Sequence, residues 1–187
     1  MKSFEESFPA IHEFLRMASG VAGNRIILGN QGRAAPEGLD PYISYLPTPL
    51  RAYAWPEQSL KEVAPVEDYD PSLGKDWKDF EAEITTNWIL NVSVTVFNRG
   101  ADTIIGRLPH SYFRDDIIAH LYKNNVSVKS YSNVRNLTSI IQAGNQPRYN
   151  LDIEMWCQLD VTYNVLKASK IPFVIRDGDN DYIIAEG

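Results

Sequence analysis

The chain has 187 residues, of which 44% are hydrophobic and 11% aromatic, enough for one domain with a real core and too many for wholesale disorder. No window approaches 18 uninterrupted apolar residues, and the acidic start MKSFEESF is unlike a secretory signal, so we expect no membrane association. The single cysteine, Cys157, excludes an intrachain disulfide and a multi-cysteine metal site.

The net charge of −6 is concentrated in one segment. Residues 56–83 contain nine acids and three lysines, whereas the rest of the chain has fifteen acids and fifteen bases. A nucleic-acid-binding protein usually shows a basic patch or stripe, and none is visible at this level. We therefore expect any DNA near this protein to pass without specific binding.

Apolar residues at helical spacing predict a first helix that begins near Phe4 and ends at Gly20, with Pro9 tolerable only in its first turn. A short buried strand is predicted at 25–28, followed by a loop over 29–41. Residues 42–55 look extended, and the prolines at 47 and 49 predict an edge or bent strand.

An acidic excursion is predicted over about residues 56–79, because the segment contains Pro65, Pro71 and Gly74 and has no sustained periodicity. We expect it to be an interaction arm. Its apolar residues are few, and two aromatic ones, Tyr69 and Trp77, are candidate contacts with a partner.

Two stretches alternate polar and apolar residues for longer than an ordinary strand needs. The first spans 84–97 and the second 149–163, with Cys157 in the apolar register of the second. Each predicts a long strand with one face for a core and one for water or a partner. The polar positions carry the candidate channel-facing residues Asn91, Ser93, Thr95, Asp152, Glu154 and Asp160.

A second helical stretch begins at Asp102, its expected cap, and continues to Leu121, with Pro109 either bending it or dividing it in two. Residues 126–141 look extended, a turn is expected at 144–147, and residues 171–185 predict a β-hairpin. The predicted fold is an α+β domain spanning 1–187: a mixed, mainly antiparallel sheet with two helices packed on one face.

No constellation of residues predicts catalysis, a metal or a cofactor. The three histidines are not spaced as metal ligands, the glycines at 29, 32 and 38 fit no phosphate-binding loop, and no serine occupies a nucleophile motif. Trp156 is the exception on the polar face of its strand. It is either covered by the chain's own excursion or hairpin, or it is an interface anchor.

Two sets of residues resemble the neck or tail terminator proteins of tailed bacteriophages. The first is Gly29-Asn30-Gln31, Ala35-Pro36-Glu37-Gly38 and Pro41-Tyr42-Ile43. The second is Val134-Arg135-Asn136-Leu137-Thr138 followed by Pro147-Arg148-Tyr149-Asn150-Leu151-Asp152-Ile153. The resemblance covers roughly residues 4–163, and it does not extend to the acidic excursion or the hairpin after Lys170.

The resemblance implies a non-catalytic virion protein, assembled in the host cytoplasm. Such a subunit forms a ring, typically a hexamer, at the head-proximal end of the tail, where it ends tube growth. Its partners would be copies of itself, the head connector or stopper protein, the tail tube, and the sheath if the tail contracts. The alternative is a non-catalytic binding module that uses a long β-hairpin for strand addition. A ring requires an oligomer near six, whereas a module stays small.

Overall fold

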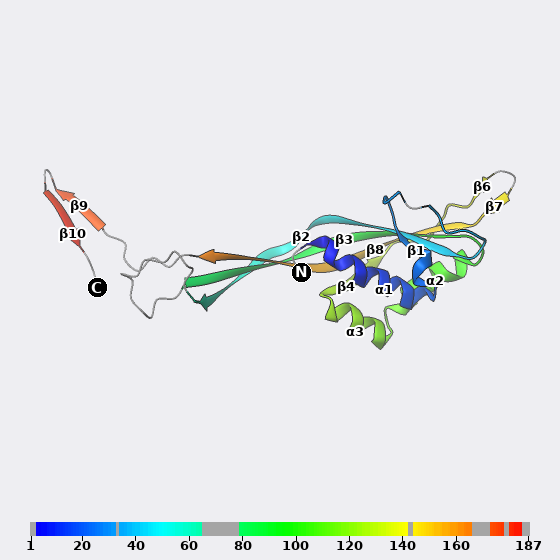
Figure 1. Cartoon of the computed structure of the whole chain (residues 1–187), viewed down its shortest axis with the longest axis horizontal. Helices are drawn as coiled ribbons and strands as arrows, with labels where there is room; N and C mark the ends of the chain where they lie inside the picture. Colours follow the sequence, from blue (N-terminus) through cyan, green and yellow to red (C-terminus); the bar gives the residue numbers. More distant parts are fainter. Residues whose placement is uncertain are drawn as a thin grey trace. The chain divides into compact units, whose positions relative to one another are not determined.

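The computed structural model describes residues 3–32, 34–64, 79–141, 144–165, 173–177 and 180–184 (Figure 1). The chain divides into two compact units, and its expected organisation as one terminator-like domain stays a prediction. The first unit contains Met1–Pro56 and Thr85–Asp160, and the second contains Glu57–Ile84 and Val161–Gly187.

The central feature is a sheet with the strand order β1-β2-β3-β8-β4. Its strands are β1 (Ile26–Leu28), β2 (Tyr42–Val63), β3 (Asp79–Phe97), β8 (Arg148–Val165) and β4 (Val126–Tyr131). β1 is parallel to β2, whereas β4 and the short β5 (Arg135–Asn136) are antiparallel to β8. The arrows of β2, β3 and β8 alternate in direction (Figure 1). The prediction of a mixed, mainly antiparallel sheet is confirmed.

The first helical segment forms as predicted. A 3-10 turn, η1 (Phe4–Ser7), leads into α1 (Phe8–Ser19), with Pro9 in the first turn, and η2 (Gly23–Arg25) follows. Gly20 ends α1 in a left-handed conformation with φ 74°, and its N–H donates to the carbonyl of Arg16 at 3.0 Å. Glycine favours this C-terminal position because it has no Cβ to oppose a positive φ.

The second helical segment is divided into α2 (Ala101–Ser111) and α3 (Asp115–Lys123). Pro109 lies inside the last turn of α2, and the break comes just after it. The prediction that Asp102 caps this helix is wrong: the N-cap is Gly100, at φ 86°, and Asp102 lies in the first turn. An acidic side chain in the first turn is favourable because it interacts with the positive end of the helix dipole. Aspartate is therefore common both at the N-cap and in the first turn, and the sequence alone did not distinguish the two positions.

The three helices cover one face of the sheet (Figure 1), and the core of the first unit lies between the two layers. Leu90, Val92, Val94 and Val96 of β3 are fully buried there. So are the alternate residues of β8, Leu151, Ile153, Met155 and Cys157. Over these stretches both strands have the alternation and the register that the sequence predicts. Beyond Cys157 the predicted apolar face of β8 is not buried, since Val161 and Tyr163 are 57% and 43% exposed.

The remaining strands form two hairpins. β6 (Ser139–Ile141) pairs with β7 (Gly144–Gln146), so the turn expected at 144–147 is largely strand. β9 (Phe173–Asp177) pairs with β10 (Asn180–Ile184), which confirms the predicted C-terminal hairpin. β2 continues to Val63, beyond the expected start of the acidic excursion, and residues 65–78 lie outside the described residues.

Prolines occupy the open edge of β2. β1 covers only Ile43–Tyr45, and the carbonyl of Tyr45 accepts a hydrogen bond from Gly29 on that side at 2.7 Å. Backbone groups of alternate residues point to the same edge of a strand, and the burial alternation of Ile43 and Tyr45 continues to Pro47, so its nitrogen also faces away from β3. Because proline has no N–H to donate, Pro47 and Pro49 discourage a further strand from adding to β2.

Cys157 should be unreactive in the folded protein. Its side chain is 1% exposed, and burial raises the pKa of the thiol to about 11. Since the thiolate is the reactive form, we expect negligible labelling by a thiol reagent at neutral pH and one equivalent of labelling after denaturation. Absorbance of the released chromophore measures both. Rapid labelling of the native protein would contradict the burial of this strand face.

Candidate interaction surface

The sheet face opposite the helices, called the open face below, carries the six residues that were expected to face a channel. Asn91, Ser93 and Thr95 on β3 and Asp152, Glu154 and Asp160 on β8 are all half-buried. Along β3 and β8 these six residues alternate with residues that point to the other face of the sheet. In the central part of each strand, the residues on that other face belong to the core under the helices. The structure therefore brings the six together on one side of the sheet, and whether that side faces a channel stays a prediction.

Asn150 joins the two long strands at this face. Its side chain is 7% exposed, and its amide nitrogen lies 3.1 Å from Ser93 Oγ, 3.2 Å from Thr95 Oγ1 and 3.2 Å from the carbonyl of Val94. A buried amide is tolerated only where its hydrogen-bonding groups find partners. Ser93 and Thr95 therefore help to fix the pairing of β3 with β8, besides lining the surface.

Asp152 and Glu154 on the open face are each paired with a cation. Asp152 forms an ion pair with Arg135 of β5, and Glu154 pairs with Lys129 of β4 at 2.7 Å. Hydrogen bonds from Lys129 and Ser130 hold the pKa of Glu154 below its usual value, and the charge of Arg51 on β2 acts in the same direction. The repulsion of phosphates expected from these two carboxylates is correspondingly reduced.

Asp160 accepts hydrogen bonds from two side chains of the described residues. Its carboxylate accepts hydrogen bonds from Thr85 Oγ1 at 3.2 Å and from Gln158 Nε2 at 3.0 Å. The Thr85–Asp160 contact and the Thr95–Asn150 contact join β3 to β8 at two points on the open face. Ile89 and Trp156 each alternate with core residues of their strands, so both lie on this face.

Trp156 is stacked on Tyr53 of β2, with ring centroids 5.5 Å apart and planes at 27°. The two side chains remain 40% and 47% exposed, and Ile89, on the same face of the intervening β3, is 2% exposed. We call Tyr53, Ile89 and Trp156 the sheet patch. In the described part of the chain, Trp156 is thus covered only in part, by Tyr53, and the patch presents aromatic surface on an otherwise polar face.

Sequence reasoning found Trp156 but missed its two companions. Tyr45 of β2 points into the core, so strict alternation would place Tyr53 there too, whereas it stacks on the open face. The alternation of β2 therefore changes between these residues, and nothing in the sequence reveals where. Ile89 was missed because it is adjacent to Leu90. When two neighbouring residues of a strand are both apolar, the sequence does not show which of them faces the core. Tyr69 and Trp77, the other two candidate interface residues, lie outside the described residues.

The residues that carried the family resemblance have structural roles. The Arg25 guanidinium donates to the carbonyls of Glu37, Asp40 and Pro41 at 2.6–3.1 Å, and thereby holds the loop before β2. Asn98 binds the same loop through the carbonyls of Gly38 and Asp40. At the other motif, Leu137 N–H donates to the carbonyl of Arg148 at 2.7 Å. These contacts position the ends of the long strands.

Within the described residues, no three metal-ligating side chains lie close enough together to hold an ion. His120 instead contacts the carbonyl of Ala10 at 3.0 Å and so joins α3 to α1. None of the described helices is both long and apolar enough to cross a membrane.

A helix-covered sheet with a polar open face and an exposed aromatic stack defines a small α+β subunit of the kind that assembles with other proteins. Residues 6–179 match the family model of the phage neck terminator proteins, and the chain belongs to that family. No curated protein matches the chain. The family resemblance inferred from the sequence is confirmed, and the protein is a structural component of the phage neck and of the virion.

Proposed function

We propose that this subunit closes into a ring, a hexamer of identical copies, at the head-proximal end of the phage tail. The ring ends the growth of the tail tube and joins the tail to the connector of the head. The observation that carries the proposal is the sheet patch: a chain of the neck terminator family exposes a stacked tryptophan and tyrosine on a polar sheet face. Aromatic side chains of this kind contribute disproportionately to protein interfaces.

The polar part of the open face is proposed to line the channel of the ring. Asn91, Ser93, Thr95 and Asp152 form that part, and Glu154 and Asp160 lie at its rim, on the strand that carries Trp156. DNA binding gains free energy when basic side chains release the counterions of the phosphates. The cations Arg135 and Lys129 are paired with carboxylates, so this surface offers DNA little to hold it.

The acidic segment, with Tyr69 and Trp77, is proposed to contact an adjacent ring, either the head connector or stopper protein, or the tail tube and its sheath if the tail contracts. Its negative charge would attract a basic surface on the partner and its aromatic residues would anchor the contact.

The alternative, a small module that binds by strand addition, finds less support. β2 carries Pro47 and Pro49 where β1 no longer covers it, and proline cannot donate the hydrogen bond that an added strand needs. A ring in which sheet faces and helices meet between copies does not depend on that edge.

Phage particles that lack the protein test the function. We expect DNA-filled heads separate from tails in electron micrographs, and tails of uncontrolled length, with joined particles restored when the protein is supplied. Normal virions in its absence would contradict the proposal. The mass of the protein in assembled tails, measured after mild cross-linking, distinguishes a ring near six copies from the monomer or dimer of a binding module.

A further inference from the structure

A second apolar surface lies on the outer side of α3. Phe113, just before the helix, is 80% exposed, and Ile118 and Tyr122 within it are 43% and 83% exposed. The opposite side of α3 is used for the core, through Ile117 and Leu121. We call Phe113, Ile118 and Tyr122 the helix patch. Three large side chains exposed this far on so short a segment form a surface suited to a partner.

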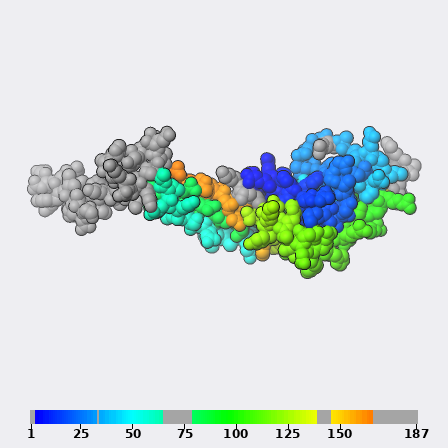
Figure 2. Space-filling model, turned by 60° about the horizontal axis from the view of Figure 1, so that its bottom comes forward, coloured from blue at the N-terminus to red at the C-terminus, as the bar shows by residue number. Residues whose placement is uncertain are grey.

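Helical spacing arranges this surface as a stripe. Ile118 and Tyr122 are four residues apart and therefore neighbours on one side of α3, with Asp115 and Ala119 beside them. Figure 2 shows α3, in yellow-green, on the outer surface of the helix layer. Asp115, in the first turn of α3, places a carboxylate at the N-terminal end of this stripe.

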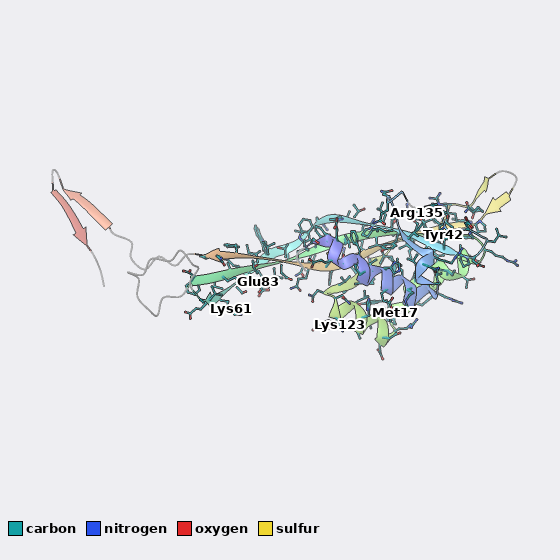
Figure 3. All side chains as sticks on the ribbon, in the orientation of Figure 1. Met17, Tyr42, Lys61, Glu83, Lys123 and Arg135 are labelled. Atoms are coloured by element: carbon teal, nitrogen blue, oxygen red, sulfur yellow. The ribbon has the colours of Figure 1, made fainter. Side chains whose placement is uncertain are left out.

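The helix patch and the sheet patch belong to opposite layers of the same unit. Figure 3 places Lys123, at the end of α3, on the helix side of the sheet. Trp156 alternates on β8 with the core residues Met155 and Cys157 and therefore lies on the other side. The helix patch therefore faces solvent on the helix side of the unit, and the sheet patch faces solvent on the opposite side. A subunit of a closed ring needs two different, complementary surfaces of this kind, since each copy contacts its two neighbours head to tail.

We propose that the helix patch of one copy packs on the sheet patch of the next, an inference that rests on the ring of the proposed function. A helix with an apolar stripe and a sheet face with apolar residues are partners that commonly pack together within domains. Charge supports the pairing as well. Asp115 begins the stripe of the helix patch, and Arg51 lies on the same strand as Tyr53, close enough to Glu154 of the open face to affect its pKa.

Cysteine cross-linking in assembled phage particles tests the contact. The changes are Ala119→Cys beside the helix patch and Ser127→Cys, which lies opposite Trp156 on β4. Both are nearly isosteric, and the native Cys157 is buried and stays in place. Particles carrying the double variant, treated with a short bis-maleimide, should give a ladder of linked subunits. Each single variant should give none, because the two sites belong to different surfaces.

A matched control replaces Ala119→Cys with Gln31→Cys, an exposed position after β1 at the other edge of the sheet, and should give no ladder with Ser127→Cys. Joined particles that contain a ring but give no 119–127 ladder would overturn this inference and leave the proposed function intact. Dimers from a single variant would also overturn it, since they require like surfaces to meet. Tails that contain no ring would instead overturn the proposed function.

Discussion

Replacing Ile153 by alanine should lower the free energy of unfolding by about 2–5 kcal/mol, the usual cost of truncating a fully buried aliphatic side chain. Ile153 is 0% exposed and lies in the core between β8 and the helices. The loss combines the transfer free energy of the missing groups with the cavity that remains. Urea unfolding followed by circular dichroism measures it.

The control for this prediction is Glu154→Ala, the adjacent residue on the opposite face. Its ion pair with Lys129 is partly exposed, and such pairs contribute little to stability, so the change should cost less than about 1 kcal/mol. If both variants lost the same free energy of unfolding, the conclusion that Ile153 is buried and Glu154 lies at the surface would be wrong.

The long strands could be predicted because side-chain alternation is a local property of the chain. Leu90 to Val96 and Leu151 to Cys157 each repeat every second residue, and only one strand register buries all of them. The first helix was equally readable, since its stripe and the terminating Gly20 are both encoded within a few residues.

Features that depend on tertiary structure could not be read in the same way. The N-cap of α2 is Gly100 in a left-handed backbone conformation, which the sequence does not show. Asp102 was predicted instead because aspartate is a common N-cap residue. Tyr53 reaches the open face only because the alternation of β2 changes along the strand. The exposure of Phe113 and Tyr122 was also hidden, because apolar residues of a helix are ordinarily assigned to its core face.

Replacing Trp156 by alanine should leave the subunit folded and impair assembly. The helix-covered face of β8 is untouched by this change, and the lost stacking on Tyr53 should cost about 1 kcal/mol of stability. An aromatic anchor at an interface contributes about 2 kcal/mol or more, which corresponds to roughly thirtyfold weaker association at each contact. Thermal unfolding of the free subunit and the yield of joined particles measure the two effects separately.

Two further variants separate an interface role from a general effect of removing apolar surface. Leu39→Ala removes a side chain that is 86% exposed in the loop before β2 and should leave both stability and assembly unchanged. Tyr53→Ala removes the stacking partner and should impair assembly as Trp156→Ala does, since the two rings form one surface. If Trp156→Ala destabilised the subunit as much as Ile153→Ala, the tryptophan would be a core residue and not an anchor. Because Trp156 keeps 40% of its surface exposed in the subunit, we expect the loss to appear in assembly.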